Sequence, residues 1–178
     1  TEDGFGHCGY SSGVITPKMP FCNGNARPIV EWDSSLLSGP DGEDWRVPVD
    51  ELESRQSILA KSLAAEGIES VYIEDPVDLY WLTGGRQNSA LLLGSEGSGI
   101  QTLHWVRKSL KRAVFEGGGD DCPHQVEEHP RMADLGGRLA KAGCSKVPAM
   151  QEGRVPRSRC SFIEQKMKSL DGESSDCT

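Results

Sequence analysis

Hydrophobic positions recur at helical spacing through the stretch between Asp50 and Gly67. The apolar side chains that fall on one side of such a helix are Leu52, Leu59 and Leu63. Asp50 is placed to cap the helix, and Glu53 stands where a capping-box acid belongs. Gly67 occupies the position that favours a left-handed residue, and Ile68 follows where it can pack back on the last turn. The pattern predicts an amphipathic helix that ends at Gly67.

Short apolar runs separated by turn residues follow this helix. Asp75-Pro76 ends the first run and can begin a helical turn, because proline is tolerated in a first turn. The segment GSEGSG between two apolar runs is typical of a β-hairpin. In chain order the pattern predicts a strand at 71–73, a short helix ending at Thr83-Gly84-Gly85, strands at 90–93 and 100–106, and a basic amphipathic helix at 107–116.

The rest of the chain divides into an arm, further elements and a tail. Residues 1–49 are rich in Gly, Pro, Ser and Asn, which predicts an extended arm on the domain or on a neighbouring chain. Beyond residue 116 the pattern predicts an acidic joint at 116–121, a helix at 132–142, a polar loop at 151–159, a helix at 161–170 capped by Ser161 and Glu164, and a polar tail at 171–178. Helices alternating with short strands, plus one hairpin, predict an α/β domain with a mixed β-sheet flanked by helices.

Several of these features stand in an order that is found in a known family. They are Gly67 at a helix end, the strand at 71–73, the turn Asp75-Pro76 and the helix end Tyr80-Trp81-Leu82-Thr83-Gly84. Residues 50–170 thereby resemble the amino-terminal domain of the creatinase/prolidase (Xaa-Pro peptidase) family. The resemblance implies a ribonuclease-H-like motif and a strand at 145–149. Gly85 departs from the family pattern, because many members have an aromatic residue there.

The resemblance also implies a function. The family's amino-terminal domain is non-catalytic, so we expect this one to mediate oligomerisation and to shape substrate access for a catalytic domain absent from this chain. Its implied partners are that catalytic domain and a second copy, as in a dimer. The implied chemistry is hydrolysis of the bond before proline at a two-metal site in the later domain. We expect this chain alone to be inactive, with no catalytic residue and no metal or cofactor. The alternative is a stand-alone interaction or regulatory module with the same fold and no peptidase activity.

One loop is a candidate for contact with substrate. In the family it lies near the substrate end of a catalytic site, often that of the neighbouring subunit. The residues that the resemblance places there are Trp81, Thr83, Arg86 and Gln87. Arg86 would meet a substrate carboxylate or an acidic partner residue, since arginine gives bidentate recognition. For the isolated chain, the pattern favours a core position for Trp81 and a surface-loop charge at Arg86.

The net charge and the cysteine spacing argue against several classes of protein. The 178 residues carry a formal net charge of −8, which argues against binding to nucleic acid or to an anionic membrane. No apolar run is long enough to span a bilayer, and no signal peptide begins at Thr1. The six cysteines are scattered and include no Cys-x-x-Cys pair. We therefore expect reduced thiols in a cytoplasmic protein.

Two further features bear on chemistry. Metal-binding residue types gather at Cys122, His124, Glu127, Glu128 and His129. Their spacing does not match the helical zinc motif, and the flanking prolines oppose a helix, so we expect a solvated loop without metal. A third hypothesis, a small independent enzyme using Cys122 or His124, would require a pocket around them. His104 alternates with Leu103 and Trp105, which favours the more exposed face of its strand.

Overall fold

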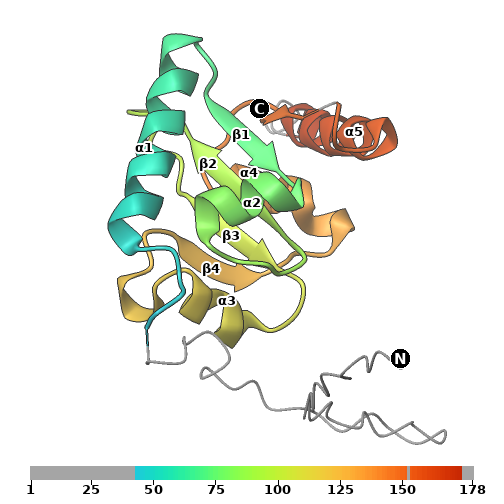
Figure 1. Cartoon of the computed structure of the whole chain (residues 1–178). Helices are drawn as coiled ribbons and strands as arrows, with labels where there is room; N and C mark the ends of the chain where they lie inside the picture. The colour runs from blue at the N-terminus through green and yellow to red at the C-terminus, as the bar shows by residue number, and fades with distance from the viewer. Residues whose placement is uncertain (1–42, 152, 174–178) are drawn as a thin grey trace, which may run out of the picture. The chain divides into compact units, whose positions relative to one another are not determined.

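The structure, a computed structural model, describes residues 43–151 and 153–173. Within these residues five strands form one mixed sheet in the order β4-β3-β2-β1-β5 (Figure 1). They are β1 (Ser70–Ile73), β2 (Ser89–Gly94), β3 (Leu103–Val106), β4 (Gln125–Glu128) and β5 (Ala149–Met150). β2 pairs antiparallel with both β1 and β3, whereas β4 and β5 pair parallel at the two edges. The predicted mixed sheet with one hairpin is confirmed.

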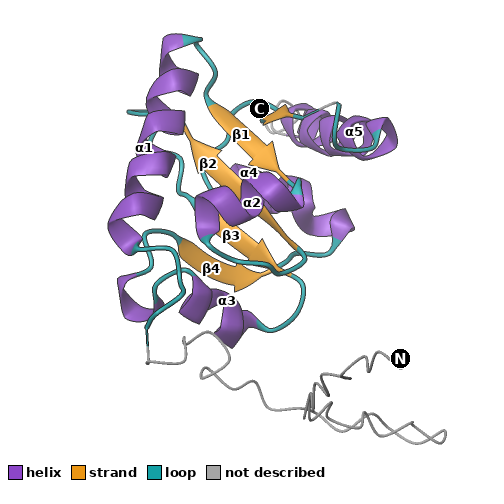
Figure 2. Ribbon diagram, viewed as in Figure 1, coloured by secondary structure: helices purple, strands orange, loops and turns teal. Residues whose placement is uncertain are grey.

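Helices pack on both faces of the sheet (Figure 2). They are α1 (Val49–Ala65), α2 (Pro76–Thr83), α3 (Leu110–Glu116), α4 (Leu135–Lys141) and α5 (Arg157–Glu173), with 3₁₀ turns at Gly119–Asp121 and Met132–Asp134. On one face Leu63 of α1 and Leu79 of α2 pack against Leu91. On the other, Leu139 of α4 packs in a cluster around Trp105. Each fully buried side chain of this size contributes roughly 2 kcal/mol to the free energy of unfolding, so both helix layers stabilise the sheet.

The sequence predicted a capping box at the start of α1 and a left-handed ending at Gly67. The helix begins at Val49, and no side chain caps its start, so the capping box predicted from Asp50 and Glu53 is wrong. Asp50 already lies inside the first turn. At the other end Gly67 has φ of +70°, and the Ile68 amide donates to the Leu63 carbonyl at 2.9 Å. This is the left-handed ending that the sequence predicted.

The carboxyl-terminal elements are displaced from their predicted positions. The expected strand at 145–149 is β5, which is shorter and lies at Ala149–Met150. α5 begins at Arg157, so Ser161 and Glu164 lie within the helix and do not form its capping box. The buried stripe of the helix includes a cysteine that the apolar pattern did not count. The buried residues of this stripe are Cys160, Ile163 and Met167.

Most of the predicted arm at 1–49, and most of the tail at 171–178, lie outside the described residues. Just before α1, Arg46 stacks its guanidinium 4.3 Å from the centre of the Phe115 ring and donates to the Phe115 carbonyl at 3.2 Å. These last residues before α1 therefore pack on α3. Within the described part of the chain, no helix is both long and apolar enough to cross a membrane.

Candidate functional site

The end of α2 forms a tight, buried turn. Thr83 donates its hydroxyl to the Leu79 carbonyl at 2.7 Å and accepts the Gly85 amide at 3.2 Å. Gly84 has φ of +69°, and its amide bonds the Tyr80 carbonyl at 2.9 Å. A Cβ at Gly84 would stand 2.9 Å from the Glu116 carbonyl, so the left-handed turn and the close approach both require glycine. The Thr-Gly pair therefore fixes where the following loop leaves the helix.

A buried carboxylate holds that loop. The side chain of Glu116, at the end of α3, is 3% exposed. Its Oε2 accepts the Arg86 amide at 3.1 Å and the Gln87 side-chain amide at 3.0 Å. Its Oε1 accepts Arg112 Nε at 2.8 Å. Because both oxygens are bonded, this carboxylate is a structural anchor for the loop rather than a free acid.

Two aromatic rings are exposed beside this turn. Trp81 is 46% exposed and Tyr80 is 38% exposed. The Arg55 guanidinium lies 5.2 Å from the Trp81 ring centre, and the Arg86 guanidinium lies 5.2 Å from that of Tyr80. Arg55 also donates to the Trp81 carbonyl at 2.9 Å. We call Arg55, Tyr80, Trp81 and Arg86 the aromatic–arginine surface.

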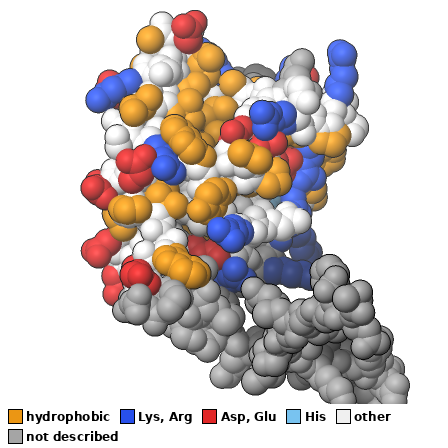
Figure 3. Space-filling model, in the orientation of Figure 1, with side chains coloured by type: hydrophobic (Ala, Val, Ile, Leu, Met, Phe, Trp, Pro, Cys, Tyr) orange, Lys and Arg blue, Asp and Glu red, His pale blue; other side chains and the backbone are white. Residues whose placement is uncertain are grey.

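The predicted core position of Trp81 is therefore wrong. α2 is a two-turn helix, and its Leu79 and Leu82 already fill the contact with the sheet, so Tyr80 and Trp81 point away from it. Hydrophobic side chains gather on the face that carries α1 and α2 (Figure 3). The exposed members on these two helices are Ile58, Val77, Tyr80 and Trp81.

The structure brings the four predicted substrate-proximal residues into one segment, but with different environments. Trp81 and Arg86 are exposed, Gln87 is half-buried and bonded to Glu116, and Thr83 is fully buried. Among the described residues, no carboxylate lies within ion-pair distance of Arg86. Trp81 and Arg86 are thus available for outside contacts, whereas Thr83 and Gln87 hold the turn.

A pair of buried histidines lies under the loop. His104 is fully buried, so its predicted exposure is wrong: helices cover both faces of the sheet, and alternation alone did not reveal this. The His104 and His124 ring centres are 5.2 Å apart. Gln56 of α1 donates to His124 Nδ1 at 3.0 Å and to the Leu82 carbonyl at 2.9 Å. Gly85 lies against His104, since a Cβ there would stand 3.4 Å from His104 Cε1.

Burial keeps both histidines neutral. Desolvation, with a smaller effect of His124, lowers the pKa of His104 to about 3. Desolvation also lowers the pKa of His124 to about 4. Within the described residues, His104 Nδ1 and Nε2 and His124 Nε2 have no hydrogen-bond partner. The pair is thus a buried polar feature with unpartnered ring nitrogens, and protonation would destabilise it.

The segment from Cys122 to His129 is only partly the expected solvated loop: Cys122 and His124 precede strand β4 without regular structure, His124 is buried, and Glu127 and Glu128 lie in the strand. Residues 125–128 form edge strand β4, and successive side chains point to opposite sides. Cys122 donates to the His124 carbonyl at 3.2 Å, and burial raises the pKa of its thiol. In the described ranges, no three His, Cys, Asp or Glu side chains come together to hold a metal. The described cysteines, Cys122, Cys144 and Cys160, are free thiols.

The roles of Glu116, Gln56 and Arg55 were not predicted from the sequence. Glu116 carried one signal, since it is the acid four residues after Arg112 in an otherwise basic helix. Gln56 and Arg55 lie on α1 but bond residues of α2 that are 26 positions away. No local pattern could reveal such contacts, because they depend on how the two helices pack.

Comparisons with known proteins support the same fold. The Creatinase/Prolidase N-terminal domain family matches residues 55–178. The N-terminal domain of the cytoplasmic peptidase PepQ from Mycobacterium tuberculosis H37Rv is similar at 21% identity and a TM-score of 0.51, over 65% of this chain and 85% of that one. An Xaa-Pro aminopeptidase from Streptococcus pyogenes is similar at 13% identity and a TM-score of 0.52, over 67% and 88%.

A third solved structure is larger than this chain. An Xaa-Pro dipeptidase from Bacillus anthracis is similar at 9% identity and a TM-score of 0.52, over 64% of this chain but only 31% of that one. No curated protein matches the sequence significantly. At these identities the structural likeness shows the fold alone.

Proposed function

Because the chain belongs to the Creatinase/Prolidase N-terminal domain family, we propose that it is the non-catalytic domain of a metal-dependent Xaa-Pro peptidase. In this proposal a separate catalytic domain cleaves the bond before proline. The divalent metals of such a domain would polarise the scissile carbonyl and activate water. The described residues of this chain offer no fitting donor set, so the proposal assigns no ligand to them. Their role is to shape access to the catalytic site and to join subunits.

The aromatic–arginine surface is the observation that carries this proposal. Exposed Trp and Tyr rings next to Arg are the residue types that dominate binding energy at protein interfaces. Trp81 offers a large apolar face to a partner, while Arg86 offers a guanidinium without a carboxylate partner in the described region. Glu116 anchors the backbone of the loop that carries Arg86, and such anchoring lowers the entropy that this residue loses on docking.

Within this surface the two outward side chains have separate roles. Trp81 packs against the partner subunit beside its catalytic site. Arg86 lies at the rim of that site and binds a carboxylate, which belongs either to the substrate or to the partner. Thr83 and Gln87 act as positioning residues, because their side chains are used inside the turn.

The experiment uses the complete native protein with Trp81→Ala, Arg86→Gln or the control Lys61→Gln, an exposed position on α1. Trp81→Ala should weaken subunit association by about tenfold or more, as measured by sedimentation. Arg86→Gln should raise KM for Xaa-Pro dipeptides more than it lowers kcat. Wild-type association and kinetics in both variants would contradict the proposal. A native protein that associates through Trp81 but hydrolyses no such dipeptide would instead be a stand-alone interaction module.

A further inference from the structure

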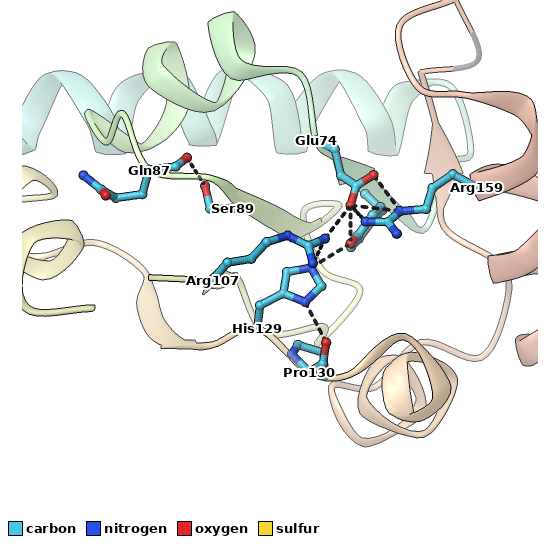
Figure 4. A network of polar contacts seen from close by, with 8 residues as sticks. Glu74, Gln87, Ser89, Arg107, His129, Pro130 and Arg159 are labelled. Carbon is cyan, nitrogen blue, oxygen red and sulfur yellow. Dashed lines mark hydrogen bonds and ion pairs between the residues drawn. The ribbon is translucent and has the colours of Figure 1, made fainter. Parts of the chain in front are cut away.

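The carboxyl-terminal edge of the sheet carries a second group of polar residues. β1, β3, β4 and β5 run in the same direction, so their carboxyl ends share one edge, where β2 begins. Glu74 follows β1, Arg107 follows β3 and His129 follows β4 (Figure 4). In α/β sheets, ligands bind at the carboxyl ends of parallel strands.

Two acids at this edge are already paired with arginines. Arg159 of α5 donates to both Glu74 oxygens, with its shortest contact at 2.6 Å. Arg154 lies 3.2 Å from Asp75. Tyr72 adds a hydrogen bond to Glu74 at 3.1 Å. Neither carboxylate therefore needs a further cation.

Arg107 shares Glu74 with Arg159 and is the third arginine at an edge with two carboxylates. Its nearest carboxylate oxygen, on Glu74, is 3.7 Å away, and the two close contacts of Glu74 go to Arg159. Arg107 instead donates to His129 Nε2 at 3.3 Å, and His129 donates from Nδ1 to the Pro130 carbonyl at 2.7 Å. A histidine that accepts at Nε2 is neutral. The edge thus holds one positive charge in excess.

Two adjoining hollows open beside these side chains. One, of about 480 Å³, is lined by polar groups that include Arg107, Asn88 and Ser89. The other, of about 500 Å³, is lined by apolar groups that include Met132 and Phe162. Glu74, Pro156 and Arg159 line both hollows. Each volume lies in the range of small-molecule sites.

We propose that this edge binds a small organic carboxylate with an apolar body. The carboxylate would lie on Arg107, whose planar donors match it, and the body would fill the hollow at Met132 and Phe162. Inorganic phosphate supplies the charge but not the apolar part. The inference does not rest on the peptidase proposal, and it uses no residue of the aromatic–arginine surface.

The test is calorimetric titration of the 178-residue chain with four probes. N-acetylphenylalanine and 3-phenylpropionate carry a carboxylate and an apolar ring, N-acetylphenylalanine amide lacks the charge, and inorganic phosphate lacks the ring. Both carboxylates should bind at least about tenfold more tightly than the amide and the phosphate. Tighter binding of N-acetylphenylalanine would identify a peptide carboxyl terminus as the ligand, and tighter binding of 3-phenylpropionate a free acid.

Variants locate the site. Arg107→Gln and Phe162→Ala should each weaken binding of the preferred carboxylate by about tenfold, whereas Lys61→Gln should leave it unchanged. Arg107→Lys keeps the charge and should retain part of the affinity, which separates charge from loss of folding. Three results would overturn the inference. They are equal affinity for the amide and the acid, unchanged affinity in folded Arg107→Gln, and no carboxylate binding at millimolar concentration.

Discussion

Oε2 of Glu116 accepts the backbone amide of Arg86 at 3.1 Å, which ties the end of α3 to the loop after α2. The two residues are 30 positions apart in the chain. The loop carries Arg86 of the aromatic–arginine surface, so the position of that arginine depends on a carboxylate buried behind it.

Replacing Glu116 tests this anchor. In Glu116→Gln one carboxylate oxygen becomes an NH₂ group, which cannot accept from Arg86, Gln87 or Arg112. A buried donor then faces another donor, and we expect a loss of about 2 kcal/mol in the free energy of unfolding. Urea unfolding measures this loss of stability. The exposed Glu96→Gln is the control and should stay within about 0.5 kcal/mol. Equal stability of the two variants would contradict the anchor role.

Gly97, in the β2–β3 turn, is a matched control for Gly84 at the end of α2. Both have positive φ, of +69° and +79°, so alanine costs about 1 kcal/mol at either position. A Cβ at Gly84 also meets the Glu116 carbonyl at 2.9 Å, whereas nothing lies within 4 Å at Gly97. Gly84→Ala should therefore destabilise the fold more than Gly97→Ala in thermal or urea unfolding. If the two losses were equal, the close approach would have no energetic weight.

The buried histidines predict a pH dependence of stability. Their pKa values are near 6.5 in the unfolded chain, but are lowered to about 3 for His104 and about 4 for His124 in the fold. As pH falls from 6.5 toward 4, the unfolded state binds more protons, so the free energy of unfolding falls. Each histidine contributes up to about 1.4 kcal/mol per pH unit.

The measurement for this histidine prediction is urea unfolding between pH 8 and 4. His104→Leu removes one titrating group and leaves no hydrogen bond unmade, because neither His104 ring nitrogen has a partner in the described structure. Its stability should decline less steeply below pH 6.5 than that of the wild type. An identical slope would show that His104 is not the group that titrates.

Two aspartates near helix starts should respond differently to alanine. Asp75 caps α2: its Oδ1 accepts the amides of Val77 at 3.0 Å and Asp78 at 3.2 Å. Asp50 makes no such bond at the start of α1. Asp75→Ala should therefore cost about 1 kcal/mol in unfolding free energy, and Asp50→Ala less than about 0.5 kcal/mol. A larger loss at Asp50 would restore the capping box that the sequence predicted.

Local signals predicted much of the fold. The end of α1 at Gly67, the start of α2 at Asp75-Pro76 and the β2–β3 hairpin all depend on residues adjacent in sequence. Each can be found because the chemistry of a turn or cap lies within a few positions. The predicted order of helices and strands follows from these boundaries.

Long-range packing explains the misses. The burial of His104 requires a helix layer on each side of β3, and strand β4 exists because it pairs with β3 about 20 residues earlier. The exposure of Trp81 follows from the leucines that occupy its helix's inner side. The polar edge at Glu74 and Arg107 is assembled from strands that are distant in sequence. No short pattern contains such information.

The most direct test of the central claim is to isolate the native gene product with an antibody against this domain and assay it on Xaa-Pro dipeptides. We expect a product of at least roughly twice the mass of this chain, because the proposal requires a further domain of usual size, and we expect metal-dependent hydrolysis. A product of this chain's own mass that hydrolyses no Xaa-Pro dipeptide would contradict it.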